Sequence, residues 1–187
     1  MGVQVRERSI DEIRQKLLGM QTALNKIIYL ESALKEINLT YDIKRFLWGE
    51  LGKLYAERLM YEKAARAMGN KAAMEISIRN KVDGYICAAE YFAKAGKVDE
   101  ADEMFIRAIR DGGAEDKTKV DLARRNIYTV NAQIMEKTGK RAGAVKFFEK
   151  LMKMNIPQME KDEIKQKLIV YYKALGHFRE ARMLEGI

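Results

Sequence analysis

Two stretches of the sequence, ADEMFIRAI at residues 101–109 and AVKFFEKLM at residues 144–152, decide the fold. In each stretch, small or apolar residues occupy the first, fourth, fifth, eighth and ninth positions. This spacing places them on one face of an α-helix. The same series begins at Ala64 and at Ala181, so the leading alanines lie 37, 43 and 37 residues apart. The chain therefore repeats itself.

A second helix precedes each of these stretches. Five residues before the leading alanine stands a glycine in three units, whereas Leu59 takes this place in the first unit. The glycines are Gly96, Gly139 and Gly176. A glycine can adopt the left-handed conformation that ends a helix. Bulky residues four positions earlier (Tyr55, Phe92, Met135 and Tyr172) continue a helical period. Each unit is therefore predicted to be a pair of antiparallel helices, and residues 115–137, which contain no helix breaker, to form one long helix.

Residues 48–55, WGELGKLY, followed by Ala64 and Met68, resemble the signature of the tetratricopeptide repeat (TPR) family. The unit at 85–113 matches it again, and the later units keep fewer of its residues. The resemblance implies an all-α fold, a right-handed α-solenoid of antiparallel helix pairs. It predicts about four hairpins within residues 41–187, roughly at 41–79, 80–113, 114–157 and 158–187. Lengthened helices such as that beginning YEKAA at 61–65 give a weaker likeness to SNAP-like TPR proteins of vesicle fusion.

Residues 1–40 are predicted to form a long N-terminal capping helix. Ser9 and Glu12 make a capping box, and apolar residues follow in steps of three and four. These are Ile10, Ile13, Leu17, Met20, Leu24 and Ile27, with a kink allowed at Gly19. Two interpretations stay open: a helix laid over the first hairpin, or a seam for a partner helix.

The C-terminal hairpin is short, because only six residues follow Ala181. We therefore expect part of the face carrying Leu168, Ile169 and Tyr172 to be exposed. Solenoid arrays close with a polar outer face. An exposed apolar face at this end predicts either that the chain is a fragment of a longer array or that another chain covers the face. We favour the second, as self-association through a terminal helix that gives a homo-oligomer.

Composition narrows the class of protein. The 187 residues include one Cys, one His and one Pro, which excludes a disulfide framework and a Cys/His zinc cluster. No apolar run is long enough for a transmembrane helix, and no export signal begins the chain, so we expect a cytoplasmic protein. Lys and Arg number 35 against 27 Asp and Glu, a net charge of +8. These charges are spread along the sequence without a basic block, which does not favour nucleic-acid binding.

No motif predicts catalysis. The stretch Thr138-Gly139-Lys140 lacks the upstream glycine and the following Ser or Thr of a phosphate-binding loop. His177 follows the glycine of an inter-helix turn, where a solvent-facing residue is expected. Cys87 has no histidine near it in the sequence and is interpreted as an inert apolar residue. We therefore expect no enzymatic activity, no cofactor and no metal.

The resemblance implies a concave groove, lined by the first helix of each pair, that binds a peptide or helix of a partner protein. Gly49 and Ile86 stand where a lysine clamp for an acidic chaperone tail would need lysine, so no such clamp is expected. The groove positions carried over are Gly49, Lys53, Glu57, Ile86, Glu90, Lys94, Asn126, Thr129, Gln133, Lys137, Gln166, Val170 and Lys173. The expected function is a non-catalytic interaction scaffold or adaptor. The alternatives are an RNA-associated helical repeat, suggested by the lysines at 53, 94, 137 and 173, and a SNAP-like membrane-traffic adaptor.

Overall fold

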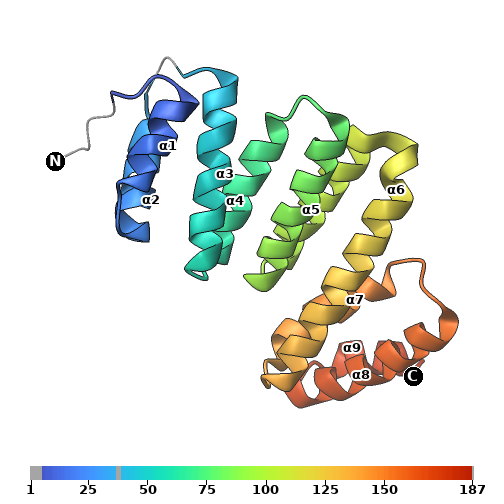
Figure 1. Ribbon diagram of the computed structural model, residues 1–187. Coiled ribbons are helices and arrows are strands. Elements are labelled where there is room, and N and C mark those ends of the chain that lie inside the picture. The colour runs from blue at the N-terminus through green and yellow to red at the C-terminus, as the bar shows by residue number, and fades with distance from the viewer. Residues whose placement is uncertain (1–5, 37–38, 187) are drawn as a thin grey trace. The chain divides into compact units, whose positions relative to one another are not determined.

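A computed structural model describes residues 6–36 and 39–186, and all regular secondary structure in these ranges is helical (Figure 1). The prediction of an all-α fold is confirmed. By packing, the chain forms two compact units, an N-terminal unit, Met1–Val120, and a C-terminal unit, Asp121–Ile187. The division falls within a helix rather than near residue 40. Each unit is described separately below.

The N-terminal unit begins with two short helices, α1 (Ile10–Leu18) and α2 (Ala23–Ala33), where the sequence predicted one long helix. This correction has a local cause. The chain leaves α1 at Gly19, and the Thr22 side chain then accepts a hydrogen bond from the backbone N–H of Asn25, which starts a new helix. At the start of α1 the Ser9 hydroxyl accepts a hydrogen bond from the Glu12 N–H, and the Glu12 carboxylate accepts one from the Arg8 N–H, one residue before the N-cap.

Four further helical segments complete the N-terminal unit. They are α3 (Tyr41–Glu57), α4 (Tyr61–Ala73), α5 (Ile78–Lys94) and the first part of α6 (Val98–Lys137). Consecutive helices pack side by side, α2 on α3, α3 on α4 and α4 on α5 (Figure 1). Thr40 and Ser77 cap α3 and α5 by accepting backbone hydrogen bonds.

The turns within the helix pairs have the predicted left-handed backbone. Gly96, Gly139 and Gly176 have φ values of 74°, 70° and 80°. Leu59, at the equivalent place in the first pair, has a φ of 58°. Glycine adopts this conformation without steric cost, whereas leucine is strained there.

Helix α6 is broken at Gly113, where φ is 73° and ψ is −161°. The chain is helical on both sides of this residue, and residues 115–137 are helical as predicted. The later part of α6, with α7 (Arg141–Met152), α8 (Gln158–Leu175) and α9 (Phe178–Glu185), forms the C-terminal unit. Within it α7 packs on α8, and α8 packs on α9.

The C-terminal helices close their own apolar face, which corrects the expectation that it would be exposed. Leu168 and Ile169 are 2% and 8% exposed, because α9, despite its short length, packs against α8. Tyr172 is half-buried and donates a hydrogen bond of 2.7 Å to the Glu149 carboxylate. The predicted reason for self-association at this end is therefore removed.

Candidate functional site

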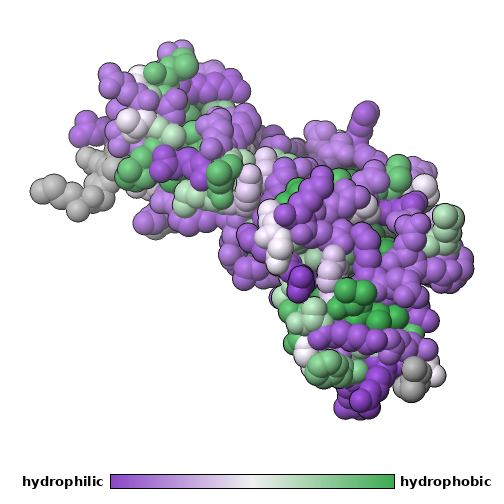
Figure 2. Space-filling model, turned by 90° about the horizontal axis from the view of Figure 1, so that it is seen from below, coloured by the Kyte–Doolittle hydropathy of each residue, from purple (hydrophilic) through white to green (hydrophobic). Residues whose placement is uncertain are grey.

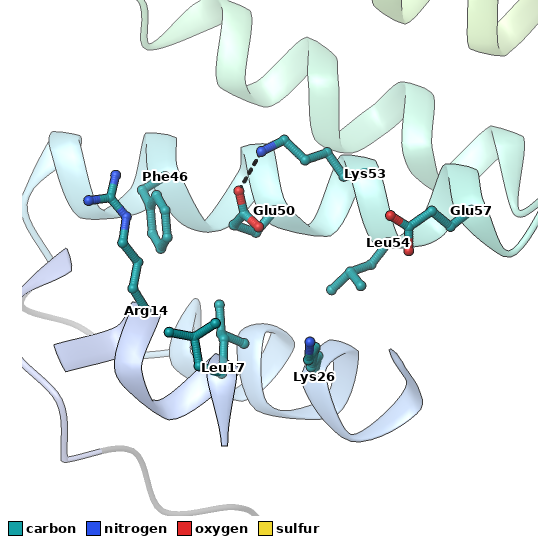
Figure 3. Close-up of a pocket in the computed structure, with 9 residues that line it drawn as sticks. Arg14, Leu17, Lys26, Phe46, Glu50, Lys53, Leu54 and Glu57 are labelled. Atoms are coloured by element: carbon teal, nitrogen blue, oxygen red, sulfur yellow. Dashed lines mark hydrogen bonds and ion pairs between the residues drawn. The ribbon is translucent and has the colours of Figure 1, made fainter. Parts of the chain in front are cut away.

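A hollow of about 390 Å³ lies between α3 and the α1–α2 pair (Figure 3). Leu17, Phe46 and Leu54 give it an apolar floor, and charged side chains surround it. Its complete lining is Arg14, Leu17, Leu18, Lys26, Phe46, Glu50, Lys53, Leu54 and Glu57. Two predicted groove residues, Lys53 and Glu57, are thus brought together here.

The face of α3 explains this arrangement. Phe46, Glu50, Lys53, Leu54 and Glu57 are separated by four, three, one and three residues, a spacing that places them on one side of a helix. A second hollow, of about 360 Å³, shares Phe46, Glu50 and Lys53 with the first. The two hollows therefore extend along the same face of α3. We call this surface the α3 groove.

Lys53 and Arg14, two of the cations in the α3 groove, are each held by a carboxylate. The Lys53 ammonium lies 2.7 Å from a Glu50 carboxylate oxygen. The Arg14 guanidinium lies over the Phe46 ring, 5.2 Å from its centroid, and also pairs with Asp11 at 3.3 Å. The groove thus combines apolar contact area with charges of both signs, which suits a peptide rather than a polyanion.

Gly49 lines the second hollow of the α3 groove through its backbone. It is buried, and a Cβ atom at this position would lie 3.3 Å from Cδ of Lys71, whose aliphatic stem crosses it. Gly49 therefore permits close packing and offers no side chain to a partner.

The predicted groove residues of α5 lie beside a pair of stacked tyrosines. Glu90 and Lys94 form an ion pair of 2.6 Å, and this hydrogen bond raises the pKa of Lys94. The Lys94 ammonium lies 5.5 Å and 6.0 Å from the ring centroids of Tyr91 and Tyr61. Ile86 is half-buried on the same helix. The lysine is held against protein groups and is not available as an isolated cation.

In the C-terminal unit, Thr129 and Gln133 line a smaller hollow of about 230 Å³ between α6, α7 and α8. Its other lining residues are Phe148, Leu151, Glu160, Glu163, Ile164 and Lys167. The remaining predicted positions do not line it, although all are exposed: Asn126, Lys137, Gln166, Val170 and Lys173. Lys173 forms an ion pair with Glu185.

Cys87 and His177, the two side chains with catalytic potential, lie in environments that do not activate them. Burial raises the pKa of the Cys87 thiol, which disfavours the nucleophilic thiolate. His177 is exposed, packs on the ring of Tyr172 and lies 3.9 Å from a Glu180 oxygen. Among the described residues, no group of His, Cys, Asp and Glu side chains is arranged to hold a metal ion.

Sequence reasoning missed the groove residues contributed by the N-terminal helices. Arg14, Leu17 and Lys26 were assigned to a capping helix, and Phe46 was not singled out. A signal existed for Phe46, because it precedes Lys53 by seven residues, two helical turns on the same face. Nothing comparable identified Arg14 or Lys26, whose positions depend on the break between α1 and α2.

Comparisons of the chain with protein-family models, curated proteins and solved structures found no match. Within the described ranges, no helix has both the length and the apolar character needed to span a membrane.

Proposed function

We propose that this chain is a non-catalytic protein–protein interaction module, a TPR-like right-handed α-solenoid that binds an extended peptide or helix of a partner protein. The α3 groove is the main supporting observation. It presents an apolar floor with charges of both signs, and Lys53 and Glu57, predicted from the sequence as groove residues, both line it.

The repeat interpretation gains support from a contact that occurs twice. The Tyr55 hydroxyl of α3 hydrogen-bonds to Glu31 of α2, and the Tyr172 hydroxyl of α8 hydrogen-bonds to Glu149 of α7. Tyr55 and Tyr172 occupy equivalent positions of the first and last predicted units. The buried residues of α2 (27, 29, 30 and 33) also have the spacing of residues 145, 147, 148 and 151 in α7. We infer that α1 and α2 are a fifth, degenerate helix pair.

Three of the four lysines proposed for RNA binding on the inner face do not favour that alternative, whereas the fourth, Lys137, forms no ion pair with a described residue. Lys53, Lys94 and Lys173 are ion-paired with Glu50, Glu90 and Glu185. An ion-paired lysine must lose its carboxylate partner before it can neutralise a phosphate. A SNAP-like adaptor is a variant of this interaction module.

Site-specific photo-crosslinking tests the proposal. A benzophenone amino acid at Glu57 should capture a specific partner from source lysate, and the same probe at Asn25, an exposed residue of α2 outside the groove lining, should not. The charge-swapped variant Lys53→Glu with Glu57→Lys keeps the net charge and should weaken binding of the captured partner at least about tenfold, since it removes two complementary charge contacts.

The matched control swaps an ion pair elsewhere, Glu62→Arg with Arg66→Glu, which preserves that pair on α4. It should leave affinity unchanged. Equal binding by both swapped variants, or equal crosslinking at Glu57 and Asn25, would reject the α3 groove as the binding site.

A further inference from the structure

The two units differ in net charge, although the charged residues are spread along the sequence without a basic block. The N-terminal unit has 21 Lys and Arg against 19 Asp and Glu, whereas the C-terminal unit has 14 against 8 in only 67 residues. Most of the net charge of +8 therefore belongs to the C-terminal unit. A cationic surface of this kind attracts polyanions.

The turn between α6 and α7 and the turn between α8 and α9 lie at the same end of the C-terminal unit (Figure 1). Several of these cations are in or next to the two turns. Contacts of Tyr171 on α8 with α6 and with α7 bring the two turns to the same end. The Tyr171 hydroxyl of α8 donates a 2.6 Å hydrogen bond to Glu136 near the end of α6. Arg141, at the start of α7, lies close enough to oppose the rise in the pKa of Tyr171.

We call this end the basic edge and define it by Lys137, Lys140, Arg141, Phe178 and Arg179. All five are exposed. Within the described part of the chain, none of the four cations forms an ion pair, in contrast to the three inner-face lysines described above. Their charges are therefore available to a ligand without breaking an internal contact.

An aromatic ring accompanies these cations. Phe178, the first residue of α9, is 59% exposed. Cations that follow a phosphate backbone, together with an exposed ring on which a base stacks, are the features by which proteins bind single-stranded nucleic acid. An acidic peptide would use the cations but would leave the ring unused.

An anionic membrane surface is the other occupant with both charge and apolar affinity. Apolar side chains do gather over the C-terminal helices in Figure 2, but they are interrupted by hydrophilic ones. Phe178 is the apolar member of the basic edge, and Leu175, beside the turn between α8 and α9, is only 37% exposed. This is little surface for insertion into a bilayer, whereas stacking requires a single ring.

We propose that the basic edge binds single-stranded nucleic acid, with the four cations on phosphates and Phe178 stacked on a base. This activity is additional to peptide binding and does not depend on the α3 groove.

Fluorescence anisotropy with the full chain tests this proposal, using labelled oligouridine and oligothymidine of about ten nucleotides, the scale of single-strand sites. Affinity should fall with salt between about 50 and 200 mM, with a log–log slope of about −3 for four phosphate contacts. Arg141→Gln with Arg179→Gln should make the slope shallower by about 1.4. Phe178→Ala should weaken binding about tenfold and leave the slope unchanged, because stacking carries no charge.

Lys146→Gln with Lys153→Gln is the matched control. It removes the same charge from two exposed residues, one within α7 and one at its C-cap, away from the two turns of the basic edge. It should change the affinity less than twofold. Equal losses in the two double variants would mean diffuse attraction and would overturn the proposal. Absence of oligonucleotide binding at about 50 mM salt would also overturn the proposal. So would Phe178-dependent binding to phosphatidylserine vesicles, or to polyglutamate, with an affinity equal to or higher than that for the oligonucleotides. The Lys53→Glu with Glu57→Lys variant should bind the oligonucleotides normally, which separates this test from that of the groove.

Discussion

The interface between α4 and α5 and the interface between α7 and α8 are packed with different kinds of residue. Between α4 and α5, small residues let the backbones approach closely: a Cβ atom on Gly84 would lie 2.8 Å from Cβ of Ala72. In the C-terminal unit, large rings fill the space instead, with Phe148 of α7 stacked on Tyr171 of α8 at 6.3 Å. The first interface should therefore be sensitive to enlargement, and the second to truncation.

The largest effect is expected from truncating an aromatic residue in the C-terminal unit. Phe147 is fully buried, and its ring centroid lies 5.7 Å from that of Tyr128. Phe147→Ala should lower the free energy of unfolding by about 3–5 kcal/mol, the usual cost of such a cavity. Hydrogen exchange should show the loss of protection in Asp121–Ile187, with less change in Met1–Val120.

The control for this truncation is Phe178→Ala in the same unit, which removes an exposed ring and should cost less than about 0.5 kcal/mol. If Phe147→Ala deprotected both units equally, the chain would be one cooperative block, and the contrast between the units would have no energetic meaning.

Enlargement of the N-terminal interface should have the next largest effect. Gly84→Ala gains helix propensity but forces a Cβ atom against Ala72, so we expect a net loss of about 2 kcal/mol. Gly69→Ala is the matched control, because its new Cβ atom would meet the Met104 sulfur at 3.4 Å and Ala88 Cβ at 3.9 Å, near ordinary contact. Urea denaturation of the two variants measures the difference, and equal stabilities would show that α4 and α5 can separate at little cost.

The sequence predicted helices on both sides of each turn residue because small and bulky residues keep a fixed spacing from it. It failed at the N-terminus because the equivalent positions there carry Gln21 in place of glycine and Lys26 in place of alanine. The pattern of α2 is recognisable only after burial is known. For the groove, the resemblance implied Lys53 and Glu57, but tertiary contact decides that the Lys71 stem lies beside Gly49 and that Lys94 is held by Glu90.

The Tyr55–Glu31 and Tyr172–Glu149 hydrogen bonds allow the same contact to be tested in both units. Tyr55→Phe and Tyr172→Phe each remove a hydrogen bond to a carboxylate and should lower the free energy of unfolding by about 1.5 kcal/mol. Tyr41→Phe, at a 76% exposed tyrosine, should have no effect. A loss at one site without the other would contradict their proposed equivalence.

These contacts also predict a pH dependence. Burial, followed by the hydrogen bonds to Glu31 and Glu149, raises the pKa of Tyr55 and of Tyr172 above the ordinary value of 10.0. The stabilisation is complete below that value and is lost as the pH rises toward the folded-state pKa. Each Phe variant should therefore lose stability less steeply than the unchanged chain above about pH 10. Identical slopes in alkaline urea titrations would contradict this assignment.

The smallest effect concerns the turns, where the first pair differs from the other three. Leu59 has the positive φ that glycine adopts elsewhere and is 70% exposed, so its side chain contributes little burial to offset the strain. Leu59→Gly should raise the free energy of unfolding by about 0.5–1 kcal/mol, since relief of left-handed strain exceeds the added flexibility of the unfolded chain. Gly96→Ala, at a φ of 74° with no atom near the new Cβ, isolates the strain and should lower stability by about 1 kcal/mol. If the two substitutions change the free energy of unfolding in opposite directions, backbone conformation rather than side-chain packing selects glycine at the turns. If Leu59→Gly destabilises the protein, the Leu59 side chain makes a stabilising contact that its exposure does not predict.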